Sequence, residues 1–183
     1  AFDIALGLFL LLLTFPIMLV TALAIILEDG GPVLYRQTRV GMNGKPFDIL
    51  KFRSMRTDAE KNSQAVWAQV GDQRVTRVGR IIRRLRIDEL PQVFNVLRGE
   101  MSVVGPRPER PTFVDELLKL IPYYSVRHSV KPGITGWAQV NGYRGETRTL
   151  DKMQARIDHD LDYLRNWSLR LDLHIILKTV IVV

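Results

Sequence analysis

The chain has 183 residues, of which 46% are hydrophobic, and this size and composition suit one domain with a substantial core. Lys and Arg number 26 against 19 Asp and Glu, a formal net charge of +7, which indicates a polyanionic partner: nucleic acid, anionic lipid or a phosphorylated substrate. The absence of cysteine excludes disulfides, thiolate catalysis and zinc–thiolate sites, and three scattered histidines argue against a His-rich metal site.

The first predicted element is an apolar helix. The run from Ile4 to Leu27 contains no charged residue and is long enough to cross a bilayer at about 1.5 Å per residue. Pro16 lies in its middle and should kink the helix, so that it either spans the membrane or turns back to the face it entered. Basic residues from Arg36 onward predict that the following side is cytoplasmic. Because the run begins almost at residue 1 without an initiator Met, we expect sequence upstream of it.

A β-hairpin and an arginine-rich stretch follow. Strand-like segments at 33–37 and 47–52 are joined through 41–44, where Asn43-Gly44 is a strong turn signal. Residues 58–72 predict a polar loop with a short helix. Six arginines lie between 74 and 86, and on a helix Arg77, Arg80 and Arg84 share a face, which is either solvated or directed at lipid or substrate phosphates.

The remaining segments predict short helices and one further strand. We expect helices at 88–97, 112–121 and 150–166, a strand at 101–104, and rigid loops at 105–108 and 131–137. The apolar segment 169–183 either lies on a membrane surface or packs as core. The fold class is therefore α+β, with a kinked membrane helix in residues 1–30 leading into a compact, helix-rich cytosolic domain in residues 31–183.

Asp88 and Glu89 are the candidate reactive residues. Asp88 is placed as a helix N-cap, and it either only caps or acts as a nucleophile kept ionised by the helix N-terminus. Adjacent helical residues point about 100° apart, so the two carboxylates need separate roles rather than a glycosidase-like pairing. Mg²⁺ suits a carboxylate that attacks a pyrophosphate. Arg107, fixed between two prolines, is the best-placed arginine for phosphate, with a structural salt bridge as the alternative.

Five motifs in fixed order resemble one family over nearly the whole chain, the monotopic phosphoglycosyl transferases, also called bacterial sugar transferases or polyprenyl glycosylphosphotransferases. Each motif is weak alone, but the set is specific. The motifs are Gly31-Pro32-Val33 with Arg36-Gln37, then residues 51–56, 88–92, 102–108 and 131–137. Residues 142–147 and 165–169 resemble the long-form members that start exopolysaccharide or O-antigen synthesis, which commonly use UDP-glucose or UDP-galactose.

The resemblance implies a two-step, Mg²⁺-assisted reaction at the cytoplasmic face of the bacterial inner membrane. Asp88 would attack the β-phosphate of a UDP-sugar, release UMP, ligate the metal and pass the sugar phosphate to undecaprenyl phosphate. Glu89 would assist with metal, proton or orientation. Phosphate binding would fall to Lys51, Arg53, Arg86 and Arg107, although Lys51 and Arg53 could equally brace the hairpin.

The resemblance also implies a re-entrant helix broken at Pro16. The family has a polar residue before this proline, whereas this chain has Phe15. The oligomeric state is left open, with a homo-oligomer among the alternatives.

Three rival hypotheses remain. A non-catalytic membrane-surface scaffold would use the basic stretch to bind anionic lipid. A nucleic-acid-binding domain accounts for the charge but not for the apolar helix, and no nucleic-acid-binding motif is recognisable. The third keeps the enzyme but lets the lipid phosphate attack the UDP-sugar directly, without a covalent intermediate.

Overall fold

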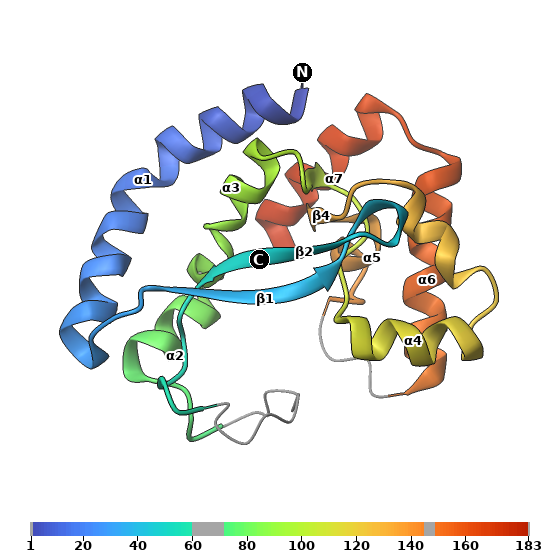
Figure 1. Cartoon of the computed structure of the whole chain (residues 1–183). Coiled ribbons are helices and arrows are strands. Elements are labelled where there is room, and N and C mark those ends of the chain that lie inside the picture. The colour runs from blue at the N-terminus through green and yellow to red at the C-terminus, as the bar shows by residue number, and fades with distance from the viewer. Residues whose placement is uncertain (1, 60–71, 145–148, 183) are drawn as a thin grey trace.

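The computed structural model describes residues 2–59, 72–144 and 149–182, and it is helix-rich with two small two-stranded sheets (Figure 1). The predicted α+β class is therefore confirmed. The prediction for residues 58–72 lies largely outside the described residues. In chain order the elements are α1 Phe2–Asp29, β1 Leu34–Val40, the 3₁₀ turn η1 Met42–Gly44, β2 Pro46–Phe52, α2 Arg77–Arg84, the 3₁₀ turn η2 Ile87–Glu89, α3 Gln92–Leu97, β3 Ser102–Val104, α4 Pro111–Leu120, η3 Tyr124–Ser129, β4 Gly133–Thr135, α5 Trp137–Val140, α6 Leu150–Arg165 and α7 Leu169–Val182.

Helix α1 is assigned as one helix through Pro16, and its ribbon changes direction along its length (Figure 1). It is long and apolar enough to cross a membrane by length and composition. One narrow face, with Gly7, Met18 and Ile25, is buried against α3 and α2, and Gly7 admits the Leu97 side chain at close range. Most of its other large apolar side chains are exposed, including Leu12, Leu13, Val20 and Leu27. Its path relative to a bilayer stays a prediction.

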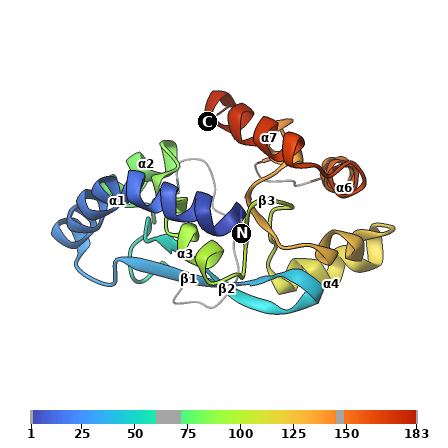
Figure 2. The same cartoon turned by 90° about the horizontal axis from the view of Figure 1, so that it is seen from above.

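The β1–β2 hairpin carries Lys51 towards the centre of the domain. Its strands are antiparallel, from Leu34 opposite Phe52 to Val40 opposite Pro46, and β1 is longer than the sequence predicted. Asn43 and Gly44 adopt positive φ values of 57° and 73°, so the expected turn is confirmed. Helix α3 lies between α1 and the hairpin (Figure 2). Its buried Asn95 accepts from Leu50 N at 2.9 Å and donates to Asp48 O at 2.8 Å, which fixes the hairpin against α3.

Strand β3 pairs in parallel with β4, and this second sheet corrects the expectation of a loop at 131–137. The pairing depends on close approach of two backbones, because a Cβ atom at Gly133 would overlap with Gly105 backbone atoms. Gly105 N donates to Thr135 O at 2.9 Å, and Gly133 N donates to Pro106 O at 3.0 Å. The segment that leads into Arg107 is thus held rigidly.

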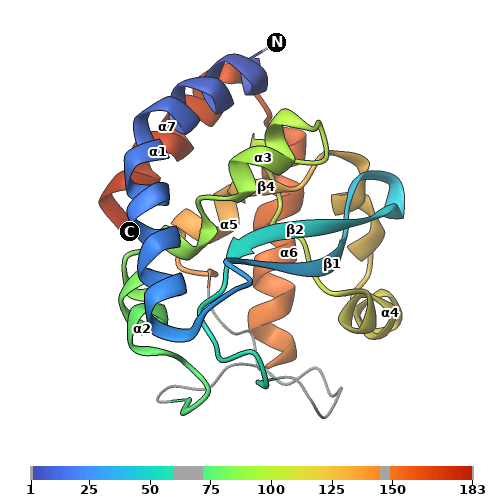
Figure 3. The ribbon, with the colours of Figure 1, turned by 60° about the vertical axis from the view of Figure 1, so that its left-hand side comes forward.

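The C-terminal segment forms α7, with one face in the core and another exposed. Ile175 is fully buried in a cluster against which Leu6 and Leu10 of α1 also pack. Leu173, Leu177 and other apolar side chains of α7 are exposed, so the core alternative describes one face of this helix and the membrane-surface alternative stays a prediction for the other. Figure 3 shows α7 behind α1, on the side of the molecule away from α4.

Candidate active site

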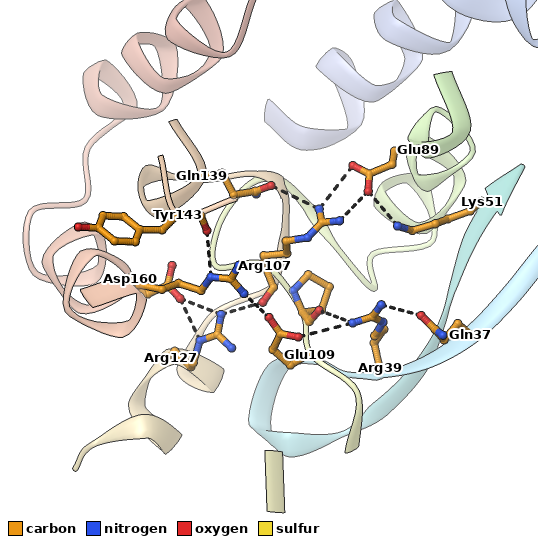
Figure 4. Close-up of polar contacts among 12 residues, drawn as sticks. Gln37, Arg39, Lys51, Glu89, Arg107, Glu109, Arg127, Gln139, Tyr143 and Asp160 are labelled. Atoms are coloured by element: carbon orange, nitrogen blue, oxygen red, sulfur yellow. Dashed lines mark hydrogen bonds and ion pairs between the residues drawn. The ribbon is translucent and has the colours of Figure 1, made fainter. Parts of the chain in front are cut away.

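Glu89 contacts two basic side chains, Lys51 and Arg107, that come from other segments of the chain (Figure 4). Glu89 is 5% exposed, and its Oε1 accepts from Lys51 Nζ at 2.8 Å and from Arg107 Nη2 at 2.6 Å. Burial alone would raise the pKa of Glu89, but Arg107 and Lys51 outweigh it and hold that pKa well below its usual range. Glu89 is therefore an ionised anchor for two cations at physiological pH, which favours orientation over proton transfer among its three predicted roles.

The local backbone explains why Asp88 and Glu89 project differently. Arg86 adopts a left-handed conformation, with φ 58°, and the chain then makes the 3₁₀ turn η2 rather than starting a regular helix. The N-cap of α3 is Pro91, three residues after Asp88. The helix expected over 88–97 is confirmed only for Gln92–Leu97, and the N-cap role of Asp88 is wrong, because the left-handed Arg86 leads into a 3₁₀ turn before α3 begins.

Asp88 is the carboxylate of the site with an unused oxygen. Its Oδ1 is buried and has no hydrogen-bond partner among the described residues. Burial and the neighbouring negative charge of Glu89 raise the pKa of Asp88, while Lys51, Arg83 and Arg86 oppose that rise. This departs from the expectation that a helix N-terminus keeps Asp88 ionised, because Asp88 lies before the start of α3 and because burial and the charge of Glu89 disfavour its ionised form.

Arg107 is supported from behind by a second layer of buried ion pairs (Figure 4). Arg127 donates to Arg107 O at 2.7 Å and pairs with Asp160 Oδ2 at 2.7 Å, with both side chains almost fully buried. Arg156 pairs with Glu109 at 2.6 Å, two residues beyond Arg107. The backbone of the 105–109 segment is thus clamped from η3 and α6, which fixes where the Arg107 guanidinium points.

The predicted phosphate-binding residues separate into two groups. Lys51 and Arg107 meet at Glu89, and exposed Arg86 lies close enough to Asp88 for its charge to act on that pKa. Arg53 lies elsewhere: it donates to Gly30 O at 2.6 Å and pairs with Asp29 at 3.5 Å, at the end of α1. This contact matches the bracing alternative for Arg53, because its guanidinium is occupied by the chain around α1.

Two further residues of the site were not predicted. Arg144 Nη2 lies 4.0 Å from Glu89 Oε2, and Gln139 Oε1 accepts from Arg107 Nη1 at 3.3 Å. Both come from the segment after the motif at 131–137, and the signals that could have suggested Arg144 are its residue type and its place in the motif at 142–147. Residues 145–147 of the long-form motif lie outside the described residues.

The described residues of the site offer one available carboxylate as a metal ligand, rather than a set of three or more protein ligands. Within residues 2–59, 72–144 and 149–182, no three His, Cys, Asp or Glu side chains converge on one point. Glu89 is already occupied by Lys51 and Arg107, whereas Asp88 has a free oxygen. Mg²⁺ is commonly held by one or two carboxylates together with substrate phosphates, so Asp88 with a diphosphate substrate fits this ion.

The site is thus an acidic pair with basic neighbours, on a helix-rich domain that carries a long apolar helix. The chain matches the bacterial sugar transferase family over residues 1–183 and belongs to it. It is 51% identical over 97% of its length to the UDP-glucose:undecaprenyl-phosphate glucose-1-phosphate transferase of Escherichia coli (strain K12). An N-acetylgalactosaminephosphotransferase of Aeromonas hydrophila, named for UDP-N-acetylgalactosamine and undecaprenyl phosphate, is 54% identical over 90% of the chain. The exopolysaccharide production protein PSS of Rhizobium leguminosarum bv. phaseoli is 47% identical over 99% of the chain.

These relatives differ in how much of their own length the chain covers. It spans 38% of the Escherichia coli and Aeromonas proteins but 92% of the Rhizobium protein. The domain therefore occurs both as part of a longer chain and as nearly a whole protein.

Proposed function

We propose that this domain transfers a hexose 1-phosphate from a UDP-sugar to undecaprenyl phosphate through a phosphosugar ester of Asp88. The observation that carries the proposal is a carboxylate with an unused oxygen, Asp88, beside a second carboxylate whose oxygens are already engaged. Lys51, Arg86, Arg107 and Arg144 surround the pair, so cations exceed carboxylates. Such a surplus suits a substrate that brings two phosphate charges.

In the first step an Asp88 oxygen attacks the β-phosphorus of the UDP-sugar. The bond between that phosphorus and the oxygen bridging to the α-phosphate breaks, and UMP leaves with the electron pair. Lys51, Arg107 and Arg144, which all approach Glu89, would neutralise the charge on the phosphate oxygens. Mg²⁺ held by Asp88 and the diphosphate would further screen the repulsion between the carboxylate and the phosphates.

In the second step a phosphate oxygen of undecaprenyl phosphate attacks the same phosphorus and releases the Asp88 carboxylate. The product is a lipid diphosphate sugar. Glu89 stays ionised throughout and holds Lys51 and Arg107 in place, because its low pKa leaves it no proton to exchange near neutral pH.

The attachment of both ends of α1 to the same domain supports a re-entrant helix. Asp3, in the first turn, accepts from Ser102 Oγ at 2.8 Å, and Glu28, in the last turn, accepts from Arg77 N at 2.7 Å. A spanning helix would separate its ends by about 30 Å of hydrocarbon. With the basic side cytoplasmic, the helix and the exposed apolar side chains of α7 would seat the domain on the cytoplasmic face of the inner membrane.

UDP-glucose is the first donor to test, because the Escherichia coli relative is named for it. The Aeromonas relative is named for UDP-N-acetylgalactosamine, so this sugar and UDP-galactose belong in the same panel.

The test is UMP release from each UDP-sugar, with undecaprenyl phosphate and Mg²⁺, together with intact-protein mass spectrometry without the lipid. We expect a phosphosugar adduct on Asp88, and Asp88→Asn should lose both the adduct and about a thousandfold or more of the rate. Asp151→Asn is the matched control, because Asp151 is an exposed carboxylate on α6. Full turnover by Asp88→Asn would refute the proposal, turnover without any adduct would favour direct lipid attack, and no UMP release at all would favour a lipid-binding scaffold.

A further inference from the structure

Asp3 is the charged residue at the start of α1, and its carboxylate bonds to a distant strand. Its Oδ1 accepts from Ser102 Oγ at 2.8 Å and from Val103 N at 3.0 Å, about a hundred residues further along the chain. The next charged residues along the chain are Glu28 and Asp29, at the other end of the helix.

The two donors lie on β3, which pairs with β4 along one edge and leaves the amide of Val103 on its other edge. Ser102 N donates to Pro132 O at 2.8 Å, on the β4 side. Val103 N points to the opposite edge, because amides alternate along a strand, and no other strand pairs there among the described residues. Val103 is 5% exposed, so its amide needs a protein acceptor, and Asp3 supplies one.

Strand β3 leads directly to Arg107. Val103 and Arg107 are joined by Val104, Gly105 and Pro106, and this segment is pinned to β4 by Gly105 N on Thr135 O and Gly133 N on Pro106 O. Because only three residues separate Val103 from Arg107, a displacement of β3 would be transmitted to the Arg107 backbone and its guanidinium, which lies 2.6 Å from Glu89.

We propose that Asp3 is a positioning residue whose carboxylate latches the first turn of α1 to the open edge of β3 and so fixes Arg107 against Glu89. The proposal rests on the proposed function for its activity readout, but the contact itself can be tested without catalysis. Through this contact, the position of α1 and the position of the segment that carries Arg107 depend on each other. Loss of the latch would leave Lys51 and Glu89 in place and loosen Arg107.

The proximity test uses the absence of cysteine from the chain. Asp3→Cys with Ser102→Cys, in membranes, is treated with a short bis-methanethiosulfonate, and each single variant is the negative control. Thr38→Cys with Asp48→Cys is a matched positive control, because that hydroxyl and carboxylate are also hydrogen-bonded, at 2.9 Å. We expect both pairs to cross-link; if only the hairpin pair does so, the latch is overturned.

The functional test compares substitutions at Asp3. Asp3→Ala should lower kcat for UMP release about tenfold or more, because small displacements of phosphate-binding groups are costly. Asp3→Asn keeps an acceptor oxygen and should stay within about fivefold of the wild type. Asp151→Ala, which removes an exposed first-turn carboxylate of α6, should leave kcat unchanged.

Cross-linking provides the rescue that separates positioning from folding. The Asp3→Cys, Ser102→Cys protein should gain activity when cross-linked and lose it again on reduction. Unchanged kcat in Asp3→Ala, or no gain on cross-linking, would overturn the latch. If the wild type and Asp151→Ala also release no UMP while the cross-link forms, the proposed function fails and the contact stands.

Discussion

Arg107 and Glu89 form the shortest ion pair of the site, with Nη2 and Oε1 2.6 Å apart. The two residues are 18 positions apart and lie on different segments, one clamped by β4, η3 and α6 and the other held in the turn η2. Lys51 reaches the same oxygen from the β1–β2 hairpin. Glu89 thus connects three segments of the chain, and its negative charge is the counter-charge of both cations.

Glu89→Gln should destabilise the domain. The substitution leaves Lys51 and Arg107 without a full counter-charge in a site where Glu89 is 5% exposed. Removing one partner from a buried ion pair costs about 3 kcal/mol or more, and we expect a loss of about that size in the free energy of unfolding. Urea unfolding in detergent measures it, with Glu116→Gln, an exposed residue of α4, as the control. Equal stability of Glu89→Gln and wild type would contradict the anchoring role.

The rate of UMP release should rise with pH through the pKa of Asp88. Burial and the charge of Glu89 raise that pKa above the ordinary value of 3.8, and only the ionised carboxylate can attack phosphorus. The acid limb of the kcat/KM profile, which reports the free enzyme, should therefore have its midpoint above pH 3.8.

The same profile measured on Glu89→Gln provides a second check of the pH dependence. Loss of the Glu89 charge removes one of the two causes that raise the pKa of Asp88, so the midpoint should move to lower pH. A midpoint unchanged in this variant would show that another group controls the limb.

The sequence predicted those parts of the fold that depend on the conformational preferences of neighbouring residues. Asn43-Gly44 identified the hairpin turn because left-handed backbone favours these residue types. Asp88, Glu89, Lys51 and Arg107 were found through motifs, and the structure brings the last three together. The turn at Asp88 was predicted as a helix because Pro91 and the following apolar residues also suit a helix start.

What the sequence could not predict depends on contacts between distant segments. Whether Arg53 faces phosphate or the carbonyls after α1 is decided by where α1 ends in space. Strand β4 forms because Gly133 lets two backbones approach, and a glycine in a Pro-Gly pair equally suits a loop. Arg144 lies in the motif at 142–147 and Asp3 directly before the apolar run, but neither position indicates a partner, and only the contacts with Glu89 and β3 show what the two side chains do.

His128 should make stability depend on pH between 6.5 and 4. Burial and the nearby Arg127 charge lower the pKa of His128 to about 4, from 6.5 in the unfolded chain. In this window the unfolded chain binds more protons, so the free energy of unfolding should fall as the pH drops from 6.5 towards 4. His128→Phe keeps the edge-to-face ring contact with Tyr124 and should flatten the slope. His174→Phe replaces an exposed imidazole and serves as the control; an equal slope in His128→Phe would contradict the assignment.

Arg144 should contribute to binding of the UDP-sugar. Its guanidinium is 4.0 Å from Glu89, too far for a strong ion pair, and its charge also reaches Asp88 and Arg107. A phosphate between these residues would give Arg144 a closer partner, and one charge-assisted contact corresponds to about a tenfold change in affinity. Arg144→Ala should therefore raise KM for the UDP-sugar about tenfold while the free energy of unfolding changes little. Arg144→Lys should be intermediate, because it keeps the charge but not the planar fork.

The control for Arg144 is Arg165→Ala, which removes an exposed arginine from the last turn of α6 and should leave KM unchanged. Steady-state UMP release at several UDP-sugar concentrations separates KM from kcat. Because Arg144 lies beside Glu89 rather than in the second layer of ion pairs, its loss should not move Arg107. If Arg144→Ala kept both the wild-type KM and kcat, Arg144 would not touch the substrate, and the cations that bind phosphate would be Lys51, Arg86 and Arg107.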